Sequence, residues 1–243
     1  MSPILSVEGV SKRFGGLTAV DDLSFDVQPG CITSLIGGNG AGKTTAFNLI
    51  TGYLKPDSGS IRFRGKRIDG LAPHRIARAG IARGFQELRL FNRLTAIDNV
   101  QAALPGQSGE SILKALLGGA GLRREARATE DAAAQVLDGL KLSHQTAALA
   151  ERLSYGQQKL LALGRLVASR GEFLMLDEPT AGLSPAMVDD FCERMRALVA
   201  DGADLFAAGG AAAARLDFAA RLRPVSLRGR SAPGAGRAAL AAR

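Results

Sequence analysis

The feature that most constrains the fold of this chain is a glycine-rich string between two apolar runs. It matches the pattern G-x-x-x-x-G-K-[ST] and consists of Gly37, Gly38, Asn39, Gly40, Ala41, Gly42, Lys43, Thr44 and Thr45. The run at residues 32–36 predicts a buried strand before the string, and residues 47–50 predict a helix after it. A strand, a tight turn and a helix in that order are typical of a phosphate-binding P-loop.

The residue types in this string suit that chemistry. Glycines let backbone N–H groups turn inward around a phosphate, and the N-terminus of the following helix adds positive potential. Lys43 supplies a point charge for the β- and γ-phosphates, and the Thr44 hydroxyl is suited to hold Mg²⁺. The alternative is a glycine-rich turn that caps a helix and binds nothing, and the flanking strand and helix disfavour it.

A second segment brings two carboxylates to the end of a strand. The apolar residues 173–176 are too few for a helix, and they are followed by Asp177, Glu178 and Pro179. Asp177 suits the coordination shell of Mg²⁺, and Glu178 suits orientation or deprotonation of an attacking water. Taken alone, this string could equally be a strand that ends in a solvated acidic turn. The upstream P-loop favours the catalytic interpretation.

A third segment predicts another capped helix. Residues 153–159 read Leu-Ser-Tyr-Gly-Gln-Gln-Lys, helical apolar spacing follows, and Ser154 is the candidate N-cap. A capped helix explains Ser154 without any ligand. Its position shortly before the acidic strand favours a helix N-terminus that faces an anion.

In this order, the segments resemble the nucleotide-binding subunit of an ABC transporter, over residues 4 to about 203. Residues 153–157 match the family signature L-S-G-G-Q except at Tyr155. Four strings are similar to those of the ATP-binding subunits of branched-chain amino acid importers: residues 12–17, 85–91, 153–159 and 176–183. The resemblance implies ATP and Mg²⁺ as ligands and ATP hydrolysis as the activity.

The resemblance also implies an α/β fold: a P-loop (RecA-like) ABC nucleotide-binding domain with an antiparallel β subdomain and an inserted α-helical subdomain. Alternation and turn signals in residues 4–30 and 59–68 agree with the antiparallel part. The expected parts are a first core segment with the β subdomain (1–85), the helical subdomain with the signature (86–157), a second core segment (158–203) and a low-complexity tail (204–243).

Roles follow from the resemblance for several single residues. Phe14 would stack on adenine, and Gln86 would touch Mg²⁺ and the attacking water. The signature residues that would face the γ-phosphate of ATP held by a second copy are Ser154, Gly156 and Gln157. An arbitrary phenylalanine is more often part of a core, and a lone glutamine in a loop is normally solvated. Only their positions relative to the P-loop favour the functional interpretation.

The resemblance further implies partners. Two subunits, identical or homologous, would close head to tail around two ATP molecules, with residues 181–184 along the seam. Transmembrane permease subunits would dock on the helical region, an extracytoplasmic binding protein would deliver the substrate, and the chain would lie at the cytoplasmic face of the inner membrane. We expect Leu90 and Phe91 to grip the permease; the alternative is that they close the core of the helical subdomain.

Composition excludes several other classes. No apolar stretch reaches ~18 residues, and the two cysteines, Cys31 and Cys192, fit a reduced cytosolic setting better than a disulfide framework. Residues 204–243 hold seven Arg against two Asp, so +5 of the net charge of +8 lies there. The remaining body is not a basic protein and lacks the basic-aromatic alternation of nucleic-acid binders. A soluble ABC protein acting on ribosomes or DNA normally carries two nucleotide modules, for which this chain is too short.

The last part of the chain departs from the family pattern. Family members have a buried strand there, followed by a switch histidine, but the only histidines here, His74 and His144, lie upstream of Asp177. Residues 204–243 contain 14 Ala, 7 Arg and 5 Gly. We therefore expect an atypical tail after about residue 203, disordered or frame-shifted, and hypothesise a change of reading frame near Ala203. Two functions remain: an active importer ATPase, favoured by Glu178, or an assembly-competent subunit with little or no hydrolysis, favoured by the missing histidine.

Overall fold

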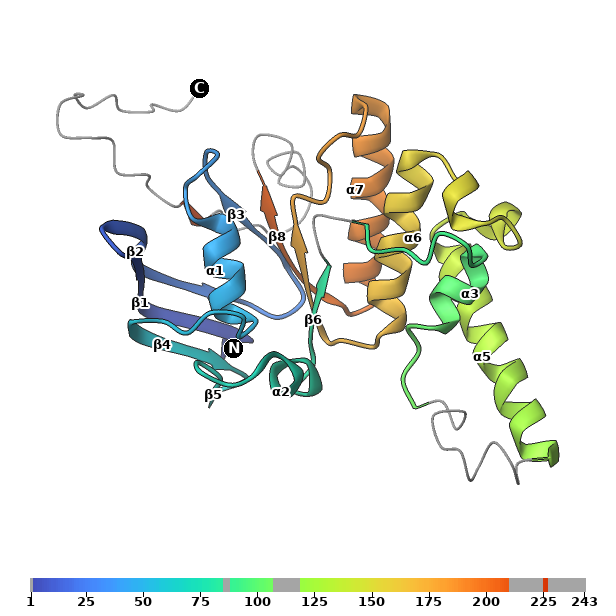
Figure 1. Ribbon diagram of the computed structural model, residues 1–243, viewed down its shortest axis with the longest axis horizontal. Helices are drawn as coiled ribbons and strands as arrows, with labels where there is room; N and C mark the ends of the chain where they lie inside the picture. The colour runs from blue at the N-terminus through green and yellow to red at the C-terminus, as the bar shows by residue number, and fades with distance from the viewer. Residues whose placement is uncertain (1, 85–87, 107–118, 210–224, 227–243) are drawn as a thin grey trace.

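The strands form two sheets (Figure 1) in the computed structural model, which describes residues 2–84, 88–106, 119–209 and 225–226. The first sheet is antiparallel, in the order β2-β1-β4-β5: Leu17–Val27, Leu5–Phe14, Ser58–Phe63 and Lys66–Arg67. The second is parallel, in the order β6-β7-β8-β3-β9: Ile81–Gly84, Phe173–Asp177, Asp204–Gly209, Ile32–Ile36 and Val225–Ser226.

Helices cover both faces of the parallel sheet (Figure 1). Helix α1 (Lys43–Ile50) lies on the face shared with the antiparallel sheet, and α6 (Tyr155–Ala168) and α7 (Pro185–Ala200) lie on the other. The remaining helices are α2 (Pro73–Arg78), α3 (Ala96–Gln101), α5 (Gly119–Gly139) and the 3-10 turns η2 (Ser143–Gln145) and η3 (Ala150–Arg152). No helix in these described ranges has both the length and the apolar character needed to cross a membrane.

Alternate residues of the central strands supply two separate cores. In β7, Phe173 and Met175 point to the core shared with α1 and the antiparallel sheet, whereas Leu174 and Leu176 point to the core under the helices. Strand β8 alternates in the same way. This is the period-2 pattern of a strand buried on both faces, and it explains why both strands consist of continuous apolar runs.

The structure confirms the expected fold class and most of its elements. The antiparallel strands, the strand before the P-loop, the helix after it and the acidic strand form where the sequence predicted them. Both cysteines are free thiols; Cys192 is buried and Cys31 is half-buried.

The second core segment extends beyond the boundary expected at about residue 203. Residues Asp204–Gly209 form strand β8, which is buried along its whole length and pairs with β7 on one side and β3 on the other. The hypothesis of a changed reading frame near Ala203 was motivated by a missing strand, and the structure contains a strand there. The rest of the proposed tail lies outside the described residues, apart from the two residues of β9.

Phe206 provides a test of this correction. Its ring is fully buried and stacks on Phe47 and Phe25, with centroids 5.1 and 5.4 Å away. We expect Phe206→Ala to lower the free energy of unfolding by about 3–5 kcal/mol, because it leaves a cavity between the two sheets. Leu17→Ala, at an exposed hairpin position, should change it by about 0.5 kcal/mol or less. Equal denaturant midpoints for the two variants would contradict the placement of β8 in the core.

Candidate nucleotide-binding site

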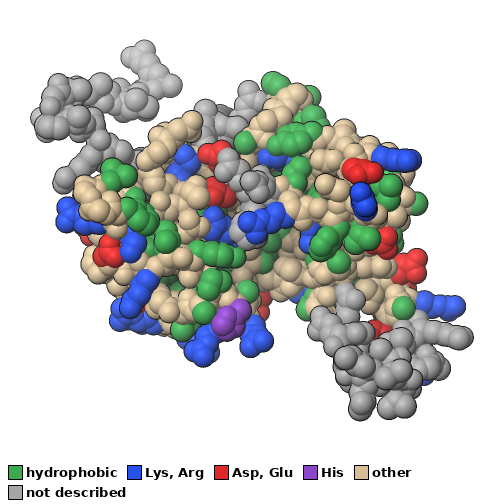
Figure 2. Space-filling model, viewed as in Figure 1, with side chains coloured by type: hydrophobic (Ala, Val, Ile, Leu, Met, Phe, Trp, Pro, Cys, Tyr) green, Lys and Arg blue, Asp and Glu red, His purple; other side chains and the backbone are tan. Residues whose placement is uncertain are grey.

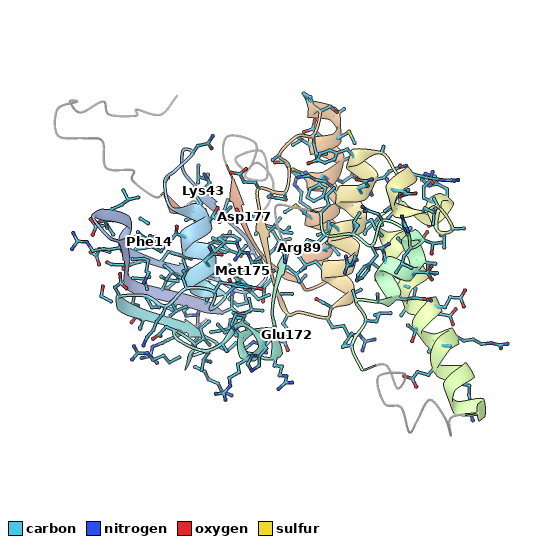
Figure 3. The ribbon with its side chains drawn as sticks, in the orientation of Figure 1. Phe14, Lys43, Arg89, Glu172, Met175 and Asp177 are labelled. Atoms are coloured by element: carbon cyan, nitrogen blue, oxygen red, sulfur yellow. The ribbon has the colours of Figure 1, made fainter. Side chains whose placement is uncertain are left out.

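The candidate site lies at one edge of the parallel sheet. Strand β3 leads into the P-loop and helix α1, and the neighbouring strands β7 and β8 end at the same edge. The carboxyl ends of parallel strands form the usual ligand crevice of open α/β sheets. Figure 3 shows Lys43 and Asp177 at this edge, with Phe14 farther out on the antiparallel sheet.

The P-loop is closed around the side chain of Lys43. This lysine is 5% exposed, and its Nζ donates hydrogen bonds to the carbonyl oxygens of Gly37 (2.8 Å) and Gly38 (2.9 Å). The ammonium therefore lies on the concave side of the loop, where it partly satisfies the loop's own carbonyl groups. The positive charge is in place at the N-terminus of α1, the position in which an anion is stabilised.

Gly42 allows the loop to approach the antiparallel sheet closely. Its φ of +87° is in the left-handed region, and a Cβ built there would lie 2.2 Å from the carbonyl oxygen of Ala19 in β2. Gly40 also has a positive φ, +76°, but a Cβ there would meet nothing within 4 Å. An alanine at either position would strain the backbone, but only an alanine at Gly42 would also clash with the neighbouring strand.

Asp177 is held by groups on two other elements. It is 5% exposed, and its Oδ2 lies 3.3 Å from Nη2 of Arg83 at the end of β6. The Thr44 side chain also acts to lower the pKa of its carboxyl group, by a smaller effect than that of Arg83. Arg83 also donates to Oδ1 of Asn48 (2.6 Å) and to the hydroxyl of Thr51 (3.1 Å) on α1. The guanidinium therefore links the acidic strand to the helix that begins at the P-loop.

The pKa of the Asp177 carboxyl group is raised above its ordinary value. Burial raises the pKa of its carboxyl group, the positive charge and hydrogen bond of Arg83 oppose that rise, and the neighbouring charge of Glu178 adds to it.

The sequence analysis did not identify Arg83 as a residue of the site. The available signal was a basic residue in the short apolar stretch before Gln86, because a charged side chain in a buried strand needs a partner.

Glu178 follows β7 in an unusual backbone conformation. Its φ is +48°, and its N–H donates to the carbonyl oxygen of Ala208 at 2.8 Å, which extends the ladder with β8 by one residue. A left-handed conformation costs a non-glycine residue about 1–2 kcal/mol and persists only where the surroundings impose it. Strand β8, which the sequence did not predict, thus supports the candidate base directly.

Phe14 ends β1 at the surface. Its side chain is 45% exposed, and Nζ of Lys12 lies 5.7 Å from its ring centroid. It is not a core residue, and its ring is accessible for stacking. Gln86 lies outside the described residues.

The signature residues lie across the sheet from α1, at the start of α6 (Figure 1). The Ser154 hydroxyl accepts from the Gln157 N–H at 3.3 Å, and the Gln157 side chain accepts from the Ser154 N–H at 2.9 Å, so the expected capping box is present. A Cβ at Gly156 would lie 1.6 Å from Cε of Met187 on α7. Within a single chain, these residues are therefore not brought to the P-loop, and each has a structural reason to be present.

The two P-loop glycines give a matched test. We expect Gly42→Ala to abolish ATP binding, because the loop must move away from Ala19 to accommodate the methyl group. Gly40→Ala should cost only the backbone strain, about 1–2 kcal/mol of stability. Fluorescence titration with an ATP analogue and thermal unfolding check both effects. ATP binding by the Gly42→Ala protein equal to that of the unmodified chain would refute the role assigned to this close approach.

Comparison with known proteins agrees with this site. Residues 20–181 match the family model described as ABC transporter. The chain is 42% identical over 198 residues to the high-affinity branched-chain amino acid transport ATP-binding protein BraF of Pseudomonas aeruginosa, covering 82% of this chain and 76% of that protein. It is 43% identical over 183 residues to LivG of Escherichia coli, which carries the same description, covering 75% and 72%.

Solved structures show the same likeness. A crystal structure described as the ADP conformation of an ATP-binding cassette of an ABC transporter superposes with a TM-score of 0.74 at 34% identity, covering 86% of this chain and 82% of that one. The matched family model spans the P-loop, the signature helix and the acidic strand. The chain therefore belongs to the ABC transporter family, as one of its ATP-binding, ATP-hydrolysing subunits.

Proposed function

We propose that this chain energises the import of branched-chain or related amino acids through an ABC transporter, by binding and hydrolysing ATP. The observation that carries the proposal is the P-loop lysine and the Asp177–Glu178 pair at one sheet edge, in a chain more than 40% identical to two branched-chain amino acid transport proteins. The alternative of a subunit with little or no hydrolysis gains no support from these relatives.

The P-loop binds the phosphates of ATP through the backbone N–H groups of residues 37–45 and the Lys43 ammonium. The ammonium donates to the Gly37 and Gly38 carbonyl oxygens, and charged phosphate oxygens are stronger acceptors for it than these neutral groups. The exposed ring of Phe14 offers a face on which adenine can stack. Figure 3 shows Lys43 at the start of α1 and Phe14 on the neighbouring antiparallel sheet.

The residues at this edge fit Mg²⁺. The Thr44 side chain is close enough to the Asp177 carboxyl group to act on its pKa, and the two groups together supply two oxygen ligands. Mg²⁺ prefers such sites, in which phosphates and water complete the coordination. When bound, Mg²⁺ neutralises charge on the β- and γ-phosphates.

Glu178 orients and deprotonates the attacking water. Its backbone is held by the hydrogen bond to Ala208, so its carboxylate extends from a fixed point next to Asp177. Phosphoryl transfer needs mainly positioned groups and charge stabilisation, and a positioned carboxylate is sufficient as the base. Gln86, which comes two residues after β6 in the sequence, is proposed as the second group on this water.

A head-to-tail pair of subunits completes each site. In one chain, Ser154, Gly156 and Gln157 lie across the sheet from the P-loop (Figure 1), so they can serve only ATP held by another subunit. The first turn of α6 offers N–H groups at a helix N-terminus to the γ-phosphate of that ATP. The turn at residues 181–184 forms the seam beside it.

The proposed permease site is a groove between α2 and β6 on one side and α6 on the other. It has a volume of about 740 Å³ and is lined by α2, β6, α6 and the segment around Arg89. Phe91 lies beside this groove rather than in its lining: its side chain is 49% exposed, and the guanidinium of the lining residue Arg165 lies 4.7 Å from its ring centroid. Leu90 packs against the helical core. Phe91 therefore suits the gripping surface and Leu90 the core-closing alternative. Figure 2 shows Lys and Arg side chains along the edge over α2, where Lys66, Arg75 and Arg78 are exposed.

Replacing the proposed base tests the hydrolytic function. We expect Glu178→Gln to retain ATP binding but to lower kcat by about 10²–10⁴-fold, because the amide cannot accept a proton. Phosphate release by the purified complex with its permease subunits measures the rate. If the variant hydrolyses ATP as fast as the unmodified protein, then Glu178 is not the base.

A charge at Phe91 tests the docking surface. We expect Phe91→Glu to weaken assembly with the permease subunits and to reduce transport by about tenfold or more, because it buries an unpaired carboxylate in an apolar contact. ATP binding by the isolated subunit should not change. Ala134→Glu, on the exposed face of α5, is the matched control and should assemble normally. Normal assembly and transport by the Phe91→Glu protein would rule out this surface.

A further inference from the structure

Two side chains at the start of α6 contact the backbone of residues 178–182, which follow β7. Tyr155 and Lys159 are four residues apart on α6, so they lie on the same helical face. Nζ of Lys159 donates to the carbonyl oxygen of Pro179 at 3.1 Å and lies 3.5 Å from that of Glu178. The same ammonium lies 5.6 Å from the centroid of the Tyr155 ring. We call these two side chains the brace.

Tyr155 contacts the same segment two residues later. Its hydroxyl lies 3.5 Å from the carbonyl oxygen of Ala181. A Cβ at Gly182, whose φ is +76°, would lie 3.1 Å from Cε1 of Tyr155. The ring therefore rests against the turn at 181–182, and a glycine in that turn makes the close approach feasible.

The position of Lys159 calls for an explanation beyond packing. It is 6% exposed, and burial lowers the pKa of its ammonium. Burying a charge is costly unless it is well hydrogen-bonded. Its hydrogen-bond acceptors are backbone carbonyl groups of the residue proposed as the base and of the residue after it. A leucine or methionine would fill the same space at lower cost but would not hold those carbonyl groups.

The brace acts where the backbone is strained. Glu178 has a φ of +48°, and its N–H is held by Ala208 of β8. Its carbonyl group is held on the other side by Lys159 and by the Ala181 N–H at 3.1 Å. A strained conformation persists only when its surroundings over-determine it. Strand β8 and helix α6 thus fix Glu178 from opposite ends of the residue.

We propose that Tyr155 and Lys159 are positioning residues that couple the two ATP sites of the dimer. The inference rests on the proposed function: the signature at the start of α6 serves ATP held by the partner subunit, whereas Glu178 serves ATP held by its own P-loop. The brace joins these two groups within one chain. When Ser154 contacts the ATP held by the partner subunit, a movement of the first turn of α6 changes the position of Lys159. Lys159 in turn changes the position of the Glu178 carbonyl group, and Glu178 activates the water.

The test uses purified full-length subunit and its complex with the permease subunits. Lys159→Met keeps the length of the side chain and removes the ammonium. We expect the affinity of the isolated subunit for ATP to stay within about twofold, kcat of the complex to fall by about tenfold or more, and the Hill coefficient for ATP to fall toward one. Lys159→Arg, which keeps the charge and the donors, should restore both values. Tyr155→Phe should lower the Hill coefficient less.

Arg194→Met provides the matched control. Arg194 is a buried cation on α7 that bonds to Asp190 at 2.6 Å, one turn away on the same helix. This variant should lose thermal stability, as Lys159→Met should, but should keep its Hill coefficient. If both variants lose similar stability and neither changes the Hill coefficient or kcat, Lys159 only packs α6 against the sheet and the proposal is wrong.

A second measurement separates this proposal from the proposed function. In a Glu178→Gln background, ATP should drive subunits into dimers, and adding Lys159→Met should raise the ATP concentration at the midpoint by about tenfold. An unchanged midpoint would overturn the coupling. Absence of hydrolysis by the unmodified complex would instead overturn the proposed function, and the dimerisation midpoint would still decide whether the brace couples the sites.

Discussion

The parallel hydrogen-bond ladder on the two sides of β7 is the constraint on which the site depends. Strand β7 pairs with β6 and β8 in continuous register, and the Glu178 N–H adds one further bond to Ala208. Since alternate side chains of β7 fill two different cores, a slip by one residue would place each of them in the wrong core. The same slip would move Asp177 away from Thr44. Core packing therefore sets the position of the two acidic side chains at the sheet edge.

The buried ion pair of Asp177 and Arg83 contributes more to the geometry of the site than to the stability of the fold. Burial opposes ionisation of the carboxyl group, and Arg83 only partly offsets that effect. Such a pair is weak support for stability, because the cost of desolvation is comparable to the attraction gained. Its geometric effect is clearer. Arg83 bonds to β7 and to two residues of α1, so the strand that carries the acid and the helix that begins at Lys43 cannot move independently.

The sequence was sufficient to predict elements whose pattern is local. The P-loop, its flanking strand and helix, the acidic strand and the Ser154 cap all follow from spacing within about ten residues. Strand β8 was missed because Ala and Gly are poor strand formers, so residues 204–209 looked like the start of a low-complexity tail. In the structure, small residues suit that position because β8 is buried between two strands and under helices. Arg83 was missed because its partners lie 32 to 94 residues away in the chain.

The separation of the signature from the P-loop has a consequence for mechanism. Within one chain, Ser154 is satisfied by its capping box, and Gly156 is packed against Met187, so contacts within the chain are sufficient to form the start of α6. A helix N-terminus that is already formed loses little conformational entropy when it binds a phosphate. The binding free energy can therefore shift the position of the groups to which the helix is hydrogen-bonded. In this chain, α6 holds the carbonyl group of Glu178 through Lys159. In the head-to-tail dimer that we propose, this helix is a physical route by which ATP in one site would influence hydrolysis in the other.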